Sequence, residues 1–201
     1  MKTERKTTIC YVLSYRSPNY IRTLVLLKAL SGMDALCLSK AVNTARGSFR
    51  YVQTLLRLLK TRITERPHAY LLGFRGYELF WPVRLMTWGR PLIVDHMMSP
   101  YDSLLNERRI LTPNSLLAKW TFLYERAVLR NADMVLTDTQ LHKTFLCDLF
   151  SIPPSKIHTI PVGTDEDLFS PSEAPLPSFR QSPLQVFFYG TFLPLHGIPV
   201  I

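Results

Sequence analysis

The chain has 201 residues, of which 47% are hydrophobic and 19% charged, so it can bury a core and is neither disordered nor fibrous. Its three cysteines, Cys10, Cys37 and Cys147, are widely spaced and odd in number, which excludes a disulfide framework and a cysteine zinc site. No apolar run reaches the roughly 18 residues of a membrane span, and the first residues lead into no signal-peptide core. We therefore expect a cytoplasmic protein.

Positive charge is concentrated in the first half of the chain. Residues 1–100 hold 16 Lys/Arg against 5 Asp/Glu, whereas residues 101–201 hold 8 against 10. A basic half of this kind suits an anionic partner such as a membrane surface, a phosphorylated lipid, a nucleotide or a nucleic acid.

Short apolar runs alternate with longer amphipathic ones. In chain order the pattern predicts strand 8–14, helix 20–30, strand 34–38, helix 48–65, strand 68–73, helix 77–88, strand 91–95, helix 113–130, strand 134–137, helix 140–150 and strand 157–162. Strands that are apolar on both faces and separated by helices are typical of parallel sheets. The predicted fold class is α/β, a doubly wound parallel sheet flanked by helices.

Domain boundaries follow from composition. Residues 169–183 hold four prolines and four serines and read as a linker, so 1–168 is predicted to form one domain. Residues 184–201 begin with an apolar run and a glycine loop, and we expect them to start a second, incomplete domain. On this interpretation the sequence is the front part of a longer protein, or a protein that has been truncated.

The stretch 132–171 reads ADMVLTDTQLHKTFLCDLFSIPPSKIHTIPVGTDEDLFSP. It resembles the end of the N-terminal domain of retaining family 4 glycosyltransferases, which have two facing Rossmann-like domains, the GT-B architecture. Residues 186–197 resemble the first strand and glycine loop of the donor-binding domain in that family. The resemblance implies that residues 1–168 form the acceptor-binding domain.

The resemblance also implies a donor site. Backbone amides at Gly190 and Gly197 would face the diphosphate of a nucleotide-sugar. Thr191 and His196 stand where the family usually has Arg and Lys, so donor binding by charge is weakened here, and a protonated His196 substitutes in part. The nucleotide-sugar is a substrate; no cofactor and no metal is expected, because no DxD triplet follows a strand.

Candidate acceptor residues follow the predicted strands, where ligands bind in such sheets. His96, after strand 91–95, is the candidate catalytic residue, for positioning or charge stabilisation rather than as a base; the alternative is a structural histidine. The candidate acceptor-binding residues are Arg16, Asn19, Arg22, Asp95 and Asp102. A solvated basic turn remains open for the first three, and a helix cap for Asp102.

Three further residues are expected to line the interdomain cleft: Thr139, Gly163 and Asp165. Helix capping is the alternative for Thr139, which stands just before a predicted helix. Gly163 and Asp165 mark the crossing between domains, where a hinge or cleft wall is expected.

Helix 48–65 is basic and amphipathic. Its apolar face comprises Phe49, Val52, Leu55, Leu56, Leu59 and Ile63, and its basic flank comprises Arg46, Arg50, Arg57 and Lys60. Such a helix suits an anionic membrane surface, although packing on the sheet is the alternative. We expect a peripheral protein on the inner face of the membrane.

The leading functional hypothesis is transfer of a sugar, with retention, from a nucleotide-sugar to a lipid-linked or polysaccharide acceptor. The 201 residues alone are expected to be inactive, because catalysis needs closure between two domains. The alternative is a non-catalytic acceptor- or membrane-binding module that works with a separate donor-binding chain. A nucleic-acid partner is not expected, since no recognition element is present.

Overall fold

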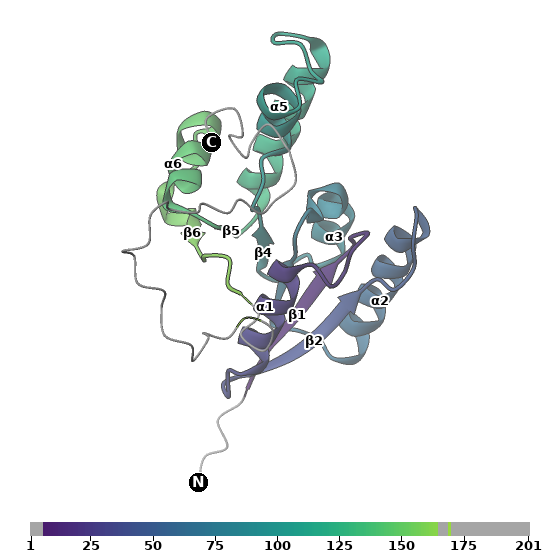
Figure 1. Ribbon diagram of the computed structural model, residues 1–201. Coiled ribbons are helices and arrows are strands. Elements are labelled where there is room, and N and C mark those ends of the chain that lie inside the picture. The colour runs from purple at the N-terminus through teal and green to yellow at the C-terminus, as the bar shows by residue number, and fades with distance from the viewer. Residues whose placement is uncertain (1–5, 165–168, 170–201) are drawn as a thin grey trace, which may run out of the picture.

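The computed structural model (Figure 1) describes residues 6–164 and Phe169. Its strands are β1 (Thr7–Leu13), β2 (Leu36–Val42), β3 (Ala69–Leu72), β4 (Leu92–Asp95), β5 (Met134–Thr137) and β6 (Ile157–Thr159). Its α-helices are α1 (Ile21–Ser31), α2 (Phe49–Thr64), α3 (Phe80–Met86), α4 (Pro100–Asp102), α5 (Leu116–Asn131) and α6 (Gln140–Phe150). Three short helical turns are η1 (Gly76–Leu79), η2 (Ser103–Glu107) and η3 (Pro154–Lys156).

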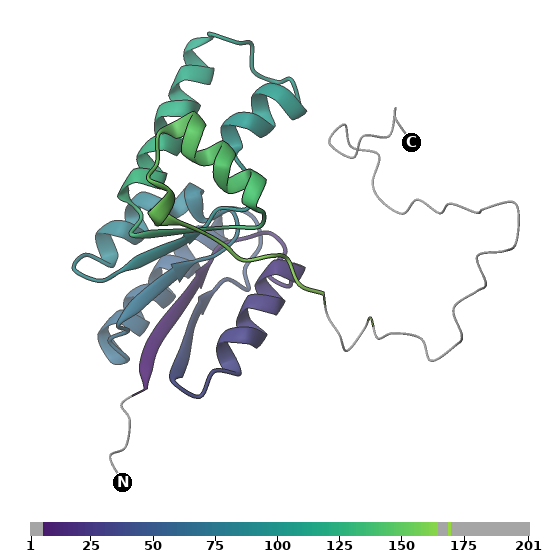
Figure 2. The ribbon, with the colours of Figure 1, turned by 90° about the vertical axis from the view of Figure 1, so that its left-hand side faces the viewer.

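The six strands form one parallel sheet in the order β2-β1-β3-β4-β5-β6. The connection β1–α1–β2 runs toward one edge, and every later connection runs toward the other. Since crossovers between parallel strands are right-handed, α1 must cover the opposite face from the later helices. Figure 2 shows α1 and α2 on opposite sides of β1 and β2. The predicted α/β parallel sheet is confirmed.

Side chains alternate along each strand between two cores. On the face of α2, α3, α5 and α6, the larger core includes Val12, Leu58 and Val94. On the face of α1, a smaller core includes Tyr11 and Leu26. Both faces of the central strands are therefore buried, which explains why their sequences are apolar throughout.

Several boundaries differ from the prediction. Strand β2 extends to Val42, because it pairs with all of β1, whereas the sequence pattern placed its end at residue 38. The stretch after β4, to which the sequence pattern assigned no element, forms α4 and η2. Ser99 caps α4 by accepting a hydrogen bond from the Asp102 amide at 3.1 Å. Strand β6 ends at Thr159, since the chain then leaves the sheet toward α1.

Helix α2 packs on the sheet through a different face from the apolar one. Thr54, Leu58 and Thr61 are its buried residues. Of the six apolar residues predicted to share a face, only Leu55 is partly buried against the core. The other five are between 45% and 65% exposed: Phe49, Val52, Leu56, Leu59 and Ile63. The helix thus has an apolar side that faces solvent.

The domain boundary at 168 stays a prediction, and so do the linker 169–183 and the second domain 184–201, which lie outside the described residues apart from Phe169. Within the described part, no helix is long and apolar enough to cross a membrane.

Candidate functional site

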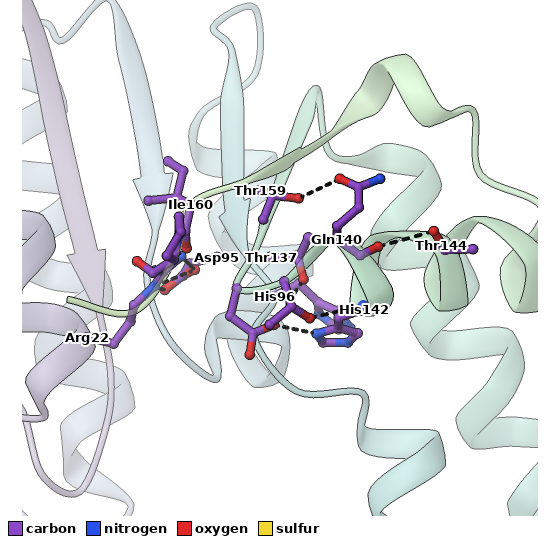
Figure 3. A network of polar contacts seen from close by, with 12 residues as sticks. Arg22, Asp95, His96, Thr137, Gln140, His142, Thr144, Thr159 and Ile160 are labelled. Atoms are coloured by element: carbon purple, nitrogen blue, oxygen red, sulfur yellow. Dashed lines mark hydrogen bonds and ion pairs between the residues drawn. The ribbon is translucent and has the colours of Figure 1, made fainter.

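All six strands end at the same edge of the sheet, so the residues that follow them meet there. Figure 3 shows side chains from α1, the end of β4 and the start of α6 together at this edge. Helix α5 and the segment before it project beyond the same edge (Figure 2). This is where a parallel sheet binds its ligands.

His96 is held by a carboxylate. It follows β4 directly, is 1% exposed, and its Nε2 lies 2.9 Å from Glu125 Oε1 of α5. The second oxygen of Glu125 accepts a hydrogen bond from the Tyr101 amide at 2.8 Å. The contact with Glu125 occupies Nε2 of His96 and holds the ring in one orientation.

A second histidine lies beside the first. The ring centroids of His96 and His142 are 6.4 Å apart. Figure 3 shows both side chains at this edge of the sheet. Nδ1 of His142 lies 2.9 Å from Asp138 Oδ1. Partial burial acts to raise the pKa of Asp138, but the hydrogen bond and charge of His142 outweigh it and lower that pKa below its ordinary value. The edge therefore holds two carboxylate-paired histidines.

Arg22 and Asp95 form a buried ion pair. Nη2 of Arg22 lies 2.9 Å from Asp95 Oδ1, and the two side chains are 1% and 0% exposed. Arg22 Nη1 also donates to the carbonyls of Ile160 at 2.6 Å and Pro161 at 3.0 Å. Burial raises the pKa of Asp95, and Arg22 opposes this shift. The pair thus ties α1, β4 and the segment after β6 together (Figure 3).

The predicted acceptor residues fall into two groups. Arg22 and Asp95 are turned toward each other and are not exposed to an acceptor, because their partners are all protein groups. Arg16 and Asn19 are exposed on the loop after β1. That loop is pinned by Asn43, whose side chain bonds both the amide and the carbonyl of Tyr15 at 2.9 Å.

Asp102, Thr139 and Gly163 have structural contacts as well. Asp102 Oδ1 accepts from Asn106 at 2.7 Å and lines a hollow of about 450 Å³ with Asp138 and His142. Thr139 caps α6, since its hydroxyl accepts from the His142 amide at 3.1 Å. A Cβ on Gly163 would lie 2.8 Å from Val25 of α1, so only glycine lets the chain pass this closely.

One comparison with known proteins gives a match. The family model of glycosyltransferase family 4 matches residues 40–168, well over half of the chain. The chain belongs to glycosyltransferase family 4. A comparison with curated proteins finds no match. The predicted family is confirmed, and glycosyl transfer is the activity of this family domain.

Two residues of the candidate site were not singled out from the sequence: Glu125 and His142. Glu125 shares the inner face of α5 with Ala118 and Val128, and a carboxylate on a core-facing position requires a buried partner. That signal was present in the helical spacing. His142 gives no comparable signal, because only the fold brings it to His96.

Other predicted positions are not described. Asp165 of the cleft, and Gly190, Thr191, His196 and Gly197 of the donor site, lie outside residues 6–164. In the part of the chain that the structure describes, no group of three or more His, Cys, Asp or Glu side chains could hold a metal ion. The expectation of a reaction without a metal stays a prediction.

Proposed function

We propose that this chain supplies the acceptor side of a glycosyltransferase that moves a sugar from a nucleotide-sugar to a lipid-linked or polysaccharide acceptor. The observation behind the proposal is the family 4 match over a parallel sheet whose carboxyl edge holds the His96–Glu125 pair. Retention of configuration is part of the proposal and rests on the resemblance to retaining family members.

The histidine pair supports a positioning role. With Nε2 of His96 bonded to Glu125, the other ring nitrogen remains for an acceptor hydroxyl or for charge that develops in the transition state. No general base is needed in a retaining reaction of this type, since the leaving diphosphate can accept the proton. In this proposal Arg16, Asn19 and Asp102 contact the acceptor, and the buried Arg22–Asp95 pair holds the segments around them.

Sugar transfer tests this proposal. The protein, expressed from its own gene, is assayed with membranes of the source cell as acceptor and a panel of radiolabelled UDP- and GDP-sugars. We expect label in the lipid or polysaccharide fraction, an unchanged anomeric configuration by NMR, and a loss of at least tenfold in kcat for His96→Ala.

His158→Ala is the matched control, because His158 is exposed on β6 and has no described contact with the site. Its transfer rate should equal that of the parent. Equal rates for parent and His96→Ala would leave the activity standing and remove His96 from the mechanism. Absence of transfer with every donor would favour the non-catalytic binding module.

We also propose that the protein docks on the cytoplasmic face of an anionic membrane. The exposed apolar side of α2 adjoins α3, where Trp81 and Leu85 are 43% and 71% exposed, and Trp88, in the turn after α3, is 73% exposed. Arg62 of α2 donates to the Trp88 carbonyl at 3.1 Å, so α2 contacts the turn that follows α3. The outer apolar surface comprises eight side chains: Phe49, Val52, Leu56, Leu59, Ile63, Trp81, Leu85 and Trp88. Tryptophan and apolar residues beside basic ones are typical of membrane interfaces.

The basic flank of α2 is smaller than its sequence suggests. Arg50 and Arg57 are half-buried and bond to protein groups, whereas Arg46 and Lys60 are exposed. Sedimentation with phosphatidylcholine vesicles, with and without phosphatidylglycerol, measures docking. Leu56→Glu/Ile63→Glu should reduce binding to anionic vesicles at least fivefold. Met33→Glu, an exposed residue after α1 on the other face of the sheet, should not; equal losses would contradict docking through α2.

A further inference from the structure

A cavity of about 510 Å³ lies beside the His96–Glu125 pair. Three parts of the chain enclose it: the turn after β3, the segment after β4, and α5. Helix α5 contributes residues 117, 120, 121, 124 and 125, a spacing that places all five on one helical face. The volume falls within the range of about 300–1,000 Å³ that small-molecule sites occupy.

The walls of the cavity are mainly apolar. Met98 and Leu104 form one side, and Leu117 and Trp120 of α5 form the other. Leu117 and Trp120 are nonetheless 63% and 71% exposed, so their apolar surface is hydrated. Covering such surface with a hydrocarbon chain is favourable by roughly 25 cal/mol per Å². The hydroxyl of Tyr124 already donates to the Tyr77 carbonyl at 2.6 Å, which leaves its ring as apolar lining.

The charged groups around the cavity differ in how far they are neutralised. Both oxygens of Glu125 are used, by His96 and by the Tyr101 amide. Glu78 lies 3.2 Å from Arg75 and 3.4 Å from Arg50. Among the described residues, none forms an ion pair or side-chain hydrogen bond with the Arg108 guanidinium. An anionic group would therefore complement the charge of Arg108 at the wall of the cavity.

We propose that the cavity binds a single-chain amphiphile, with the hydrocarbon chain against α5 and a phosphate at Arg108. The inference deepens the proposed function and rests on it in one respect: the amphiphile is the carrier part of a lipid-linked acceptor. A hydrocarbon chain bound in the cavity lies against Glu125, the residue that orients His96. Arg50 and Arg75 share Glu78, so the start of α2 adjoins the cavity, and a membrane-docked α2 brings the cavity close to the lipid.

Tryptophan fluorescence can test binding without any sugar. The chain has three tryptophans, so Trp81→Phe/Trp88→Phe leaves Trp120, on the cavity wall, as the reporter. The probe is dodecyl phosphate with bromine on its last carbon, kept below its critical micelle concentration. We expect saturable quenching of Trp120. Inorganic phosphate alone should not compete, which separates an amphiphile site from a site for free phosphate.

Two variants test where the hydrocarbon chain and the phosphate of the probe bind. Thr121→Phe places a larger side chain on the cavity face of α5 and should weaken binding at least tenfold. Arg108→Gln should weaken binding of dodecyl phosphate about fivefold and leave binding of dodecanol unchanged. Arg109→Gln is the matched control, since Arg109 is the next residue and does not line the cavity.

Quenching that is absent, that persists unchanged in Thr121→Phe, or that is equally strong with dodecanol would overturn the proposal. Its failure is separable from failure of the proposed function. Sugar transfer to a lipid acceptor without probe binding would remove the cavity site and keep the glycosyltransferase. Probe binding without transfer would keep the cavity site as a lipid-binding site.

Discussion

Arg22 directs its guanidinium entirely to protein groups. It bonds Asp95 through two nitrogens and reaches two backbone carbonyls beyond β6. A buried charge is tolerated only when such partners are complete, because water is not there to replace them. Arg22 therefore fixes the chain around the candidate site, and the direct acceptor contact that the sequence indicated for it stays a prediction.

Removing one member of this pair should be costly. Arg22→Leu leaves the Asp95 carboxylate buried without its partner, and we expect a loss of about 3–5 kcal/mol in the free energy of unfolding. Urea denaturation measures it. Arg22→Leu/Asp95→Leu should recover most of that loss, since no unpaired charge remains. A single variant within 1 kcal/mol of the parent would show that the pair is not buried as described.

Cys10 shows how burial changes the pKa of a thiol. It lies in the larger core at 0% exposure, and burial raises the pKa of its thiol to about 11. Because the thiolate is the reactive form, Cys10 should resist a thiol reagent at pH 8 in the folded protein. Exposed Cys37 should react at once.

Counting thiols with and without denaturant checks this prediction. Cys37→Ser should remove the fast phase, and denaturant should release Cys10 for reaction. Fast labelling of Cys10 in the native protein, located by mass spectrometry, would contradict it.

At the scale of elements, α6 shows how a local signal and a site residue can coincide. Thr139 was predicted either to line the cleft or to cap a helix, and the structure shows the cap. The two roles make different demands: a cap lowers the free energy of the helix, whereas a cleft residue affects turnover.

Thr139→Ala should therefore reduce stability by about 1 kcal/mol, the usual value of an N-cap. Thr144→Ala, one turn further along the exposed side of α6, should change stability by less than about 0.5 kcal/mol. Thermal unfolding compares them. A drop in transfer by Thr139→Ala at unchanged stability would favour the cleft role over the cap.

Helix α2 shows the limit of periodicity. Its spacing correctly predicts a helix with an apolar face, and the structure confirms the helix at 49–64. The same spacing cannot say which face meets the sheet. Thr54 and Thr61 are buried because small side chains allow close approach there, and Thr54 donates its hydroxyl to the Leu13 carbonyl at 3.1 Å. Because the face with Thr54 and Thr61 packs on the sheet, the apolar face of α2 points to solvent.

For the whole molecule, the uneven charge bears on membrane docking. If docking combines apolar insertion with attraction of the basic half to anionic lipid, salt should weaken only the second contribution. Raising ionic strength from about 0.1 M to 1 M shortens the Debye length from about 10 Å to 3 Å. We expect binding to anionic vesicles to fall severalfold and binding to neutral vesicles to stay constant. Salt-independent binding to both would exclude an electrostatic contribution.

The sequence by itself determined the α/β class, the family, and most elements to within a few residues. Those features depend on local periodicity and on contiguous motifs such as 132–171. It also pointed to His96, because the end of an apolar strand in a parallel sheet is a predictable place. It could not pair His96 with Glu125, since these residues are 29 positions apart and meet only when α5 packs beside β4.

Tertiary structure alone decided which charged side chains pair with other protein groups, which side of α2 faces solvent, and where His142 lies. Each depends on contacts between elements remote in the chain, such as the one between Arg22 and Ile160, which are 138 positions apart. Hydrogen bonds and burial act over a few ångströms in space, and a linear pattern contains no such distances. The elements follow from local sequence, whereas the candidate site arises from their packing.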